Sequence, residues 1–360
     1  MSVTVVVGGQ YGSEGKGKVC AHLAVTGRAD LMVRCGGPNS GHTVQTATRR
    51  YQLRQVPAGF LNPGTRLLLA PGALVDPAVF LHEVDICGLD PTRIGVDANA
   101  GIIEESDVRM EQSESLQARL GSTGVGMGAA VSRRVLRSAG FRLAREVPEL
   151  KAFVTSVDEE VLSAVRANRR IVVEGTQGFG LSLYHTEQWP FCTSRDTTAH
   201  SFLGEVGLGV RDFDVIMAIR TYPIRVGGNS GPLPNEITWE EVRRRSGYPE
   251  PVTEYTTTTK RLRRVAEFAW DVVLRAVAAN CPSQIAVHGM DYLDFKNKFA
   301  SSYEGLTDGA KDFVQAVVAR TGVAVTLIGT GPGQDEIIDI KSARSSTGAK
   351  ATTKGAPING

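Results

Sequence analysis

Short apolar segments of four to six residues recur along the whole chain and are rich in Val, Ile and Leu. Such runs are typical of strands buried on both faces of a parallel sheet. Between them, apolar residues recur at steps of three and four, which is the spacing of amphipathic helices. Strands are expected at 3–7, 31–34, 66–70, 171–174, 214–219, 284–287 and 323–328. Helices are expected at 15–26, 77–87, 107–120, 156–168, 260–279 and 307–320. This alternation predicts an α/β fold with a mostly parallel central sheet flanked by helices.

The length of 360 residues and the apolar content of 42% allow one large domain or two ordinary ones. No internal repeat and no linker divides the chain, so we expect a single domain over residues 1–340. The remaining segment, KSARSSTGAKATTKGAPING, is small, polar and basic. This composition predicts a flexible tail over residues 341–360.

Charge and cysteine content narrow the expected partners and the compartment. The 40 basic and 38 acidic residues leave a net charge of +2 without a long block of one sign, which favours free nucleotides over a nucleic acid polymer. The five cysteines are scattered and never in C-x-x-C spacing, which indicates neither a disulfide framework nor a zinc site. No signal-like N-terminus and no apolar run of ~20 residues is present. We therefore expect a cytoplasmic protein with no membrane partner.

The first apolar run leads directly into a glycine-rich turn, VVVGGQYGSEGKGKV at residues 5–19. A strand that passes through glycines and lysines into a helix is typical of a loop that binds phosphates with its N–H groups. The usual P-loop spacing is absent, because five residues separate Gly9 from Gly15, and Gly17 stands where a magnesium-binding Ser or Thr would follow the lysine. The glycines and the two lysines predict a polyphosphate site. A tight turn with solvated lysines is the alternative.

Four other expected strands also run into glycine-rich turns: RCGGPNSGHT, VEGTQGFG, IAVHGMDYLD and LIGTGPG. In an open parallel sheet such strand ends line a shared ligand crevice, so we expect these turns to converge with the first loop. The turn RCGGPNSGHT places Asn39 and His42 among glycines. A single histidine is more often structural than catalytic, but a position next to a phosphate loop favours a catalytic role for His42.

Seven segments together resemble the adenylosuccinate synthetase family. They are GGQYGSEGKGK, CGGPNSGHT, GSTGVGMG, EGTQGFGLSLYHTEQWPFCTSRDTTA, RVGGNSGPLPNE, TTTTKRLRR and GTGP. The resemblance spans nearly the whole chain in the right order, although the chain is shorter than the usual member. It implies the P-loop-like adenylosuccinate synthetase fold. Without the resemblance, TTTTKRLRR would be interpreted as a polar loop and the start of a helix.

The resemblance implies a ligase reaction. A nucleoside triphosphate phosphorylates O6 of a purine monophosphate, and the amine of L-aspartate then displaces the phosphate. Phosphorylation is needed because an oxide is a poor leaving group and phosphate is a good one. Mg²⁺ and basic residues would offset the charge that gathers during transfer.

The resemblance also assigns residues of this chain to roles. His42 would act as general acid, and the catalytic set is Ser13, Lys16, His42 and Gln177, with Gln177 at the purine O6. The triphosphate would contact Gly12, Glu14, Gly15, Lys16, Gly17, Thr43, Asp291, Gly331 and Pro332. The purine nucleotide would contact Ser13, Asn39, Thr123, Gln177, Thr193 and, from the second subunit of a homodimer, Arg137. L-aspartate would contact Thr258, Thr259, Arg261 and Arg263. The metal would be bound by Ser13 and the Gly41 carbonyl.

Ser13 departs from the family pattern. The family carries an aspartate there, which takes the purine N1 proton and binds magnesium, whereas a neutral hydroxyl is a poor base and a weaker ligand. A smaller, uncharged side chain leaves room beside the edge where guanine carries its 2-amino group. The same serine is found in the phage-encoded 2-aminoadenylosuccinate synthetases, which use dGMP and whose chains are also short. The Ser13 hydroxyl, a water or the phosphate donor itself would then move the proton.

Gly289 is the second departure. Family members that use GTP carry a T-K-x-D type turn, whose lysine packs on guanine and whose aspartate accepts hydrogens from it. Here Gly289 replaces the lysine while Asp291 remains. This change favours ATP or dATP as the phosphate donor. If the chain is phage-encoded, the expected location is the host cytoplasm. The alternatives are an ordinary adenylosuccinate synthetase that uses IMP and GTP, and a catalytically silent protein that binds purine nucleotides.

Overall fold

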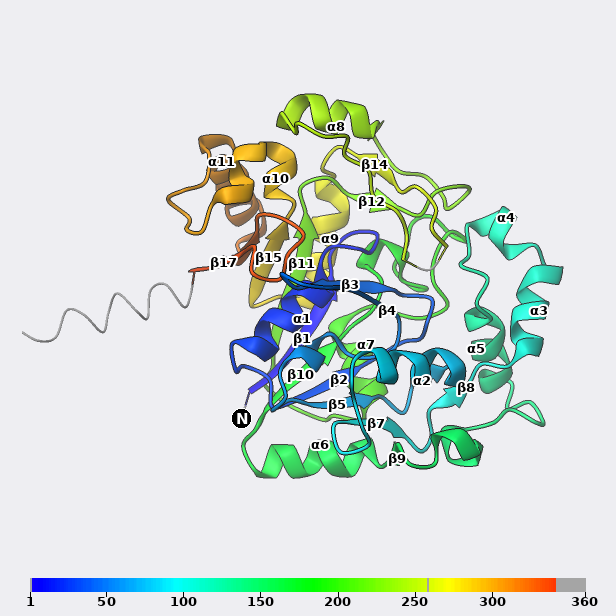
Figure 1. The fold of residues 1–360 in the computed structure, drawn as a ribbon. Coiled ribbons are helices and arrows are strands. Elements are labelled where there is room, and N and C mark those ends of the chain that lie inside the picture. Colours follow the sequence, from blue (N-terminus) through cyan, green and yellow to red (C-terminus); the bar gives the residue numbers. More distant parts are fainter. Residues whose placement is uncertain (1, 258, 341–360) are drawn as a thin grey trace, which may run out of the picture.

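The computed structural model describes residues 2–257 and 259–340. The tail predicted over residues 341–360 lies outside the described residues. In the described part, one ten-stranded sheet runs through the molecule (Figure 1). All neighbouring strands pair in parallel except the last pair, β16 and β17. The order of strands across this sheet is β17 (Ile337–Asp339), β16 (Val325–Gly329), β15 (Gln284–His288), β11 (Asp214–Arg220), β1 (Ser2–Gly8), β10 (Arg170–Glu174), β2 (Leu31–Arg34), β5 (Arg66–Leu69), β7 (Ile94–Asp97) and β9 (Val154–Thr155).

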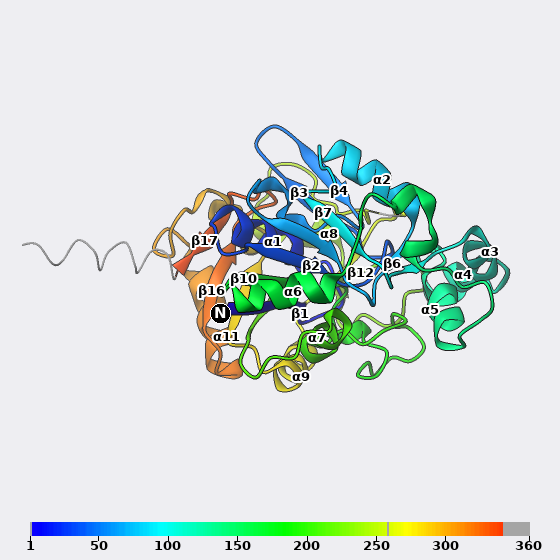
Figure 2. The ribbon, with the colours of Figure 1, turned by 90° about the horizontal axis from the view of Figure 1, so that it is seen from below.

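Helices cover both faces of this sheet, as Figure 2 shows for α1 and α2 on one side and α7 and α9 on the other. One face carries α1 (Lys16–Val25) and α2 (Pro77–Ile86). The other carries α6 (Val157–Arg166), α7 (Ala199–Val206), α9 (Trp270–Asn280) and α11 (Asp308–Thr321). In β1, Val5 and Val7 pack on the second face while Val6 packs on the first, because successive strand residues point to opposite faces. This explains why the strands are apolar without interruption. The predicted α/β fold class is confirmed.

Smaller elements surround the carboxyl ends of the strands. A three-stranded antiparallel sheet contains β12 (Ile224–Arg225), β14 (Arg264–Ala266) and β13 (Glu236–Ile237), with α8 (Trp239–Ser246) beside it. Two pairs of short strands are β3 (His42–Gln45) with β4 (Arg50–Leu53), and β6 (Leu74–Val75) with β8 (Gly101–Ile102). The remaining α-helices are α3 (Glu105–Ser113), α4 (Leu116–Leu120), α5 (Met127–Val135) and α10 (Met290–Leu293). None of the helices described is long and apolar enough to cross a bilayer.

Two helix predictions were wrong. The helix expected at 260–279 is instead β14 followed by α9, because β14 finds antiparallel partners in β12 and β13 that local periodicity does not reveal. The helix expected at 107–120 is divided into α3 and α4 by Ser115, whose φ of 52° is left-handed and interrupts helical geometry. The other four expected helices occur within two residues of their predicted bounds.

Candidate active site

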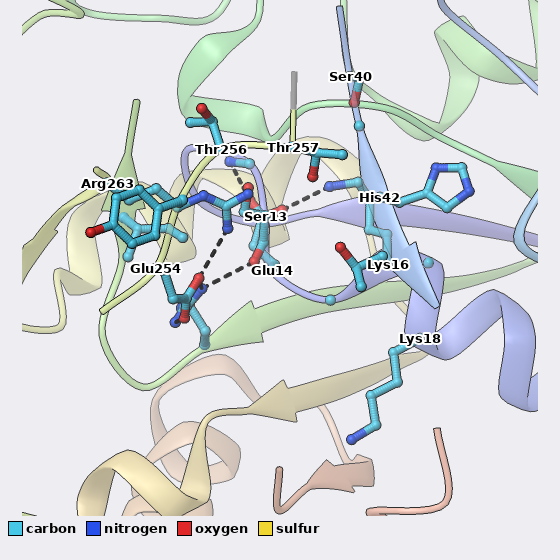
Figure 3. A pocket seen from close by; sticks show the side chains of 18 of the residues that line it. Ser13, Glu14, Lys16, Lys18, Ser40, His42, Glu254, Thr256, Thr257 and Arg263 are labelled. Carbon is cyan, nitrogen blue, oxygen red and sulfur yellow. Dashed lines mark hydrogen bonds and ion pairs between the residues drawn. The ribbon is translucent and has the colours of Figure 1, made fainter. Parts of the chain in front are cut away.

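A cavity of about 550 Å³ lies at the carboxyl ends of the central strands. All five glycine-rich turns contribute to its wall, so the predicted convergence is confirmed. Of the predicted site residues, the cavity is lined by Gly12, Ser13, Glu14, Gly15, Lys16, Gly17, Asn39, Gly41, His42, Thr43, Thr123, Gln177, Thr259, Arg263, Asp291, Gly331 and Pro332. In the view of Figure 3, Ser13, Glu254 and Arg263 lie on one side and His42 and Lys18 on the other.

Four predicted residues are not among those that line the cavity. Thr258 lies outside the described residues. Thr193 and Arg261 lie outside the cavity wall, and the Arg261 guanidinium lies beside Gly228 instead. Arg137 is exposed in the turn that follows α5, with a left-handed φ of 53°. Its predicted role requires a second subunit. The structure of a single chain does not test that role, which stays a prediction.

The phosphate loop owes its shape to left-handed residues between β1 and α1. Gly12, Ser13 and Gly15 have φ values of 91°, 60° and 95°. At Gly15 a Cβ atom would lie 2.7 Å from Cδ2 of His288, so a side chain is excluded both by the backbone angle and by space. Ser13 is exposed to the cavity at the turn of the loop. The loop therefore presents N–H groups and one small hydroxyl to a ligand.

The side chain of Glu14, a residue predicted to contact the triphosphate, makes its contacts within the loop. Its side chain is fully buried, and Oε1 accepts hydrogen bonds from the N–H groups of Gln10 at 3.1 Å and Gly12 at 2.7 Å. Oε2 accepts from Nζ of Lys16 at 2.8 Å. A carboxylate would also repel a triphosphate. Glu14 therefore stabilises the loop and pairs with Lys16, and its contact with a triphosphate stays a prediction.

Gln177 is fixed next to this loop. Its carbonyl oxygen accepts a hydrogen bond from Nζ of Lys16, and its N–H donates to Oγ of Ser40 at 3.4 Å. Its φ of 62° is left-handed, which turns the chain sharply after β10. The side chain at this turn lines the cavity, as the prediction for the purine O6 requires.

His42 lies in the cavity wall beside an ion pair that the sequence analysis missed. Arg34 and Glu174 end the neighbouring strands β2 and β10 and bind each other through Nη1 and Oε1. Nδ1 of His42 lies 3.8 Å from Oε1 of Glu174. Burial, together with the positive charge of Arg34, holds the pKa of His42 well below its ordinary value. Both ring nitrogens are buried, and by hydrogen-bond geometry neither has a partner within the described residues.

A second missed group lies around Glu254. Its carboxylate accepts hydrogen bonds from Nη2 of Arg220 at 2.5 Å, from Nη1 of Arg263 at 3.0 Å and from the Tyr292 hydroxyl at 3.0 Å. Burial alone would raise the pKa of Glu254, but the two guanidinium groups outweigh it and lower the pKa to about 2. In both groups an arginine is the last residue of an apolar strand, Arg34 in β2 and Arg220 in β11. A charged residue at the end of an apolar run was the sequence signal that could have indicated these two ion pairs.

Asp291 also lines the cavity, next to Tyr292 on α10. Burial raises its pKa to about 6, although its Oδ2 accepts a hydrogen bond from the Tyr248 hydroxyl at 2.5 Å. Nearby, Nζ of Lys18 donates to the carbonyl oxygens of Gly331 at 2.7 Å and Glu336 at 2.5 Å. Burial lowers the pKa of Lys18 to about 8. Lys18 thus connects α1 to the turn after β16. Asp291 lines the cavity, where its carboxylate can accept hydrogen bonds from a ligand.

The donor atoms near the phosphate loop determine how a metal can bind. Across residues 2–257 and 259–340, no three His, Cys, Asp or Glu side chains gather into a metal site. Ser13 and Gly41 line the cavity with neutral oxygens, while the Glu14 carboxylate is occupied by Lys16 and two N–H groups. Magnesium commonly keeps waters and binds proteins through few oxygens together with substrate phosphates. These neutral oxygens fit a magnesium ion held mainly by substrate phosphates, and Ser13 and Gly41 stay the predicted protein ligands.

Comparisons with known proteins agree with this site. The family model described as adenylosuccinate synthetase matches residues 5–147 and 142–300. An adenylosuccinate synthetase from Archaeoglobus fulgidus is 38% identical over 347 residues, which cover 96% of this chain and 100% of the relative. An adenylosuccinate synthetase from Methanocaldococcus jannaschii is 39% identical over 347 residues, which cover 95% of this chain and 98% of the relative. The chain thus spans the full length of these relatives.

Two solved structures share the fold. The fully ligated adenylosuccinate synthetase from Plasmodium falciparum superposes with a TM-score of 0.82 at 19% identity and covers 94% of this chain and 100% of its own. The succinoaminodeoxyadenylate synthetase of cyanophage S-2L, bound to dGMP and to dATP as an energy donor, has a TM-score of 0.78 at 27% identity, with coverages of 97% and 99%. The family model and the archaeal relatives both match this chain over most of its length. The chain belongs to the adenylosuccinate synthetase family, whose members are ligases that form a C–N bond between aspartate and a purine nucleotide.

Proposed function

We propose that this ligase joins L-aspartate to C6 of dGMP at the expense of ATP or dATP. The product would be 2-amino-2'-deoxy-N6-succinyladenylate, a precursor of 2-aminoadenine in phage DNA. The observation that carries the proposal is Ser13, a small neutral side chain exposed to the cavity where the family pattern has an aspartate.

The reaction has two steps in this site. In the first, the purine O6 attacks the γ-phosphorus of the donor and the bond to the β-phosphate oxygen breaks, while the N1 proton passes to the Ser13 hydroxyl, a water or the phosphate donor. Lys16 and the loop N–H groups hold the phosphates, and His42, which its lowered pKa keeps neutral in the free site, donates an N–H hydrogen bond to the transferred group. In the second, the aspartate amine attacks C6 and the C6–O6 bond breaks, so that phosphate leaves with O6. Gln177 orients O6, and Arg263 binds a carboxylate of aspartate. Magnesium, when bound, would neutralise phosphate charge.

The geometry around Ser13 supports a 2-amino purine. The left-handed backbone places this residue at the turn of the loop, where its side chain meets the cavity. An aspartate there would bring a carboxylate and more bulk against the ligand, whereas serine leaves space and a hydroxyl that can accept a hydrogen from the 2-amino group. The cyanophage structure bound to dGMP is consistent with this proposal.

The donor end of the cavity supports adenine. Gly289 has a φ of 81°, and a Cβ atom there would lie 2.8 Å from Oγ1 of Thr221, so this turn is built for glycine instead of the family lysine. Since Tyr248 donates to Oδ2 of Asp291, Oδ1 is the oxygen with more capacity to accept from a base. One acceptor suits the single 6-amino group of adenine better than the two adjacent N–H donors of guanine.

An ordinary adenylosuccinate synthetase, with IMP and GTP, is the second candidate. It is favoured by the archaeal relatives, which are 38% and 39% identical and equally short. The short chain therefore does not distinguish the phage-encoded branch from ordinary members. The choice between the candidates rests on Ser13 and Gly289. A catalytically silent nucleotide binder is the weakest alternative, because Lys16, His42 and Gln177 all line the cavity.

We also propose a homodimer in which Arg137 reaches the nucleotide of the partner subunit. Arg137 follows two exposed apolar side chains at the end of α5, Val135 at 72% and Leu136 at 70% exposure. Apolar residues next to an exposed arginine are typical of protein interfaces. A second copy of the chain would cover them.

The test is the substitution Ser13→Asp. We expect kcat/KM for dGMP to fall by about a hundredfold or more relative to IMP, since a site built around one polar group discriminates by several powers of ten. The assay is phosphate release with saturating ATP, magnesium and aspartate, with dGMP or IMP varied. Ser302→Asp is the matched control, because Ser302 is exposed outside the cavity and accepts a hydrogen bond from Gly305 that aspartate can also accept. A wild-type preference for IMP, or an unchanged dGMP-to-IMP ratio in Ser13→Asp, would refute the proposal.

A further inference from the structure

Glu254 joins two parts of the cavity that are far apart in the sequence. On one side, Arg220 binds Glu254 through both terminal nitrogens, and its Nη1 also donates to the carbonyl oxygen of Ser13 at 3.3 Å. The N–H of Arg220 donates to Oε1 of Gln10 at 3.0 Å, and Nε2 of Gln10 donates back to the Arg220 carbonyl oxygen. Arg220 is thereby fixed to the loop that carries Ser13.

On the other side, Glu254 holds the turn that carries the predicted aspartate ligands. Nη1 of Arg263 donates to its carboxylate, and the N–H of Arg263 donates to its carbonyl oxygen at 2.8 Å. Within the turn, Thr256 accepts a hydrogen bond from the N–H of Arg261 at 2.9 Å, and its hydroxyl lies 2.7 Å from that of Thr259. The orientation of Arg263 therefore depends on both the side chain and the backbone of Glu254.

The charges in this cluster do not balance. Arg220 and Arg263 carry two positive charges and Glu254 one negative charge, with 7%, 14% and 21% of their side chains exposed. All four contacts of the Glu254 carboxylate are made to three side chains, so it has little capacity for a further donor. Nε of Arg220 is buried and has no partner among the described residues. Counting these three side chains alone, one positive charge is in excess. Since Asp291 also acts electrostatically on Arg220, Arg263 is the group that suits a carboxylate of the substrate.

We propose that Glu254 is a positioning residue that couples the aspartate site to the Ser13 loop through Arg220. It deepens the proposed function, because it explains how aspartate binding and purine binding influence each other. When a substrate carboxylate binds Arg263, the guanidinium shifts its hydrogen bonding toward the ligand. Glu254 then binds Arg220 more fully, and Arg220 holds the carbonyl of Ser13 against the purine. By reciprocity, a bound purine strengthens aspartate binding by the same factor.

The test compares Glu254→Gln with a matched control. Glu236→Gln removes a carboxylate that binds the adjacent Arg264 at 2.6 Å, but neither Glu236 nor Arg264 lines the cavity. In Glu254→Gln we expect KM for aspartate to rise by about tenfold or more, because both arginines lose their anionic partner. KM for ATP should change less than KM for aspartate, since Glu254 reaches the Asp291 end of the cavity only through the Tyr292 hydroxyl. Glu236→Gln should change neither.

The coupling is measured by calorimetric titration of dGMP, with magnesium and a non-hydrolysable ATP analogue, in the absence and presence of saturating aspartate. In the wild type we expect aspartate to tighten dGMP binding by about fivefold or more, and in Glu254→Gln this ratio should fall to about one. A purely structural role would weaken binding but leave the ratio unchanged. Glu254→Asp keeps the charge with a shorter reach, so its ratio should be intermediate; it also serves if Glu254→Gln does not fold.

Two results would overturn the inference: a wild-type ratio of one, or a ratio that Glu254→Gln leaves intact. Failure of the proposed function is a different observation. If IMP is turned over instead of dGMP, the substrate proposal is wrong, and the same titrations with IMP still test the role of Glu254.

Discussion

Replacing Asp291 by Asn is predicted to stabilise this protein. Asp291 is 4% exposed, and burial raises the pKa of its carboxyl from 3.8 to about 6. At neutral pH the folded chain therefore carries a carboxylate whose ionisation is less favourable than in the unfolded chain. Asparagine is nearly isosteric, is uncharged, and offers its amide oxygen to the Tyr248 hydroxyl that now donates to Oδ2.

The size of the effect follows from the pKa. Each pKa unit is worth about 1.4 kcal/mol, so the rise from 3.8 to about 6 costs roughly 3 kcal/mol at pH 7.5. For about 340 ordered residues the unfolding entropy is about 0.7 kcal/mol/K, so Tm should rise by about 4 °C. As the pH falls through 6, the wild-type carboxylate becomes protonated and the penalty shrinks. At pH 5 the advantage of the variant should be about half as large.

The assay is thermal unfolding of wild type and Asp291→Asn at pH 7.5 and pH 5, together with kcat/KM for ATP and GTP. Because the asparagine oxygen accepts from Tyr248, its NH2 group faces the base and cannot accept from the 6-amino group of adenine, so turnover with ATP should fall by about tenfold or more. A guanine donor needs two acceptors and should not be used. A lower Tm at pH 7.5, or a stability difference that does not shrink at pH 5, would refute the reasoning. Loss of ATP turnover with retention of GTP would refute the interpretation of the base site.

The remaining predictions concern the acid and the dimer. His42→Asn should lower kcat by about a hundredfold or more, which is the usual contribution of a positioned acid or base. The control His82→Asn, on the exposed side of α2, should have no effect. Near-normal turnover of His42→Asn would contradict the role of His42. Arg137→Leu and Lys16→Ala should each be inactive, and an equimolar mixture should recover about a quarter of the wild-type activity, because half of the dimers would contain one intact site. A monomeric mass together with no recovery would exclude the shared site.

Most of the fold could be predicted from local patterns. Every expected strand is present, because strands buried on both faces must be apolar throughout and stand out against polar turns. The predictions failed where tertiary partners or single backbone angles decide the structure. At Arg264–Ala266 the chain pairs with β12 and β13, although its local pattern continues into a helix. At Ser115 a left-handed angle ends a helix whose periodicity continues.

The site was predictable where the loop sequence itself determines the chemistry. Glycines with left-handed angles and a lysine at the start of a helix build an anion site within a dozen residues, so Lys16 and its loop could be identified from the sequence. The direction of the Glu14 side chain could not be predicted in the same way, since it accepts hydrogen bonds from Gln10 and Gly12 within the loop. The direction of a side chain in such a turn depends on the backbone angles around it.

The sequence by itself determined the alternation of strands and helices, the phosphate loop and the position of Ser13 in it, because each depends on residues close together in the chain. Tertiary structure alone decided which charges meet in the cavity. Arg34 meets Glu174 across 140 positions, Arg220 meets Glu254 across 34, and Tyr248 meets Asp291 across 43. These partners depend on the order of strands in the sheet, and the energy of each group depends on its burial and on its partner's charge. For that reason the neutral His42, the ionised Glu254 and the weakly acidic Asp291 are properties of the folded cavity.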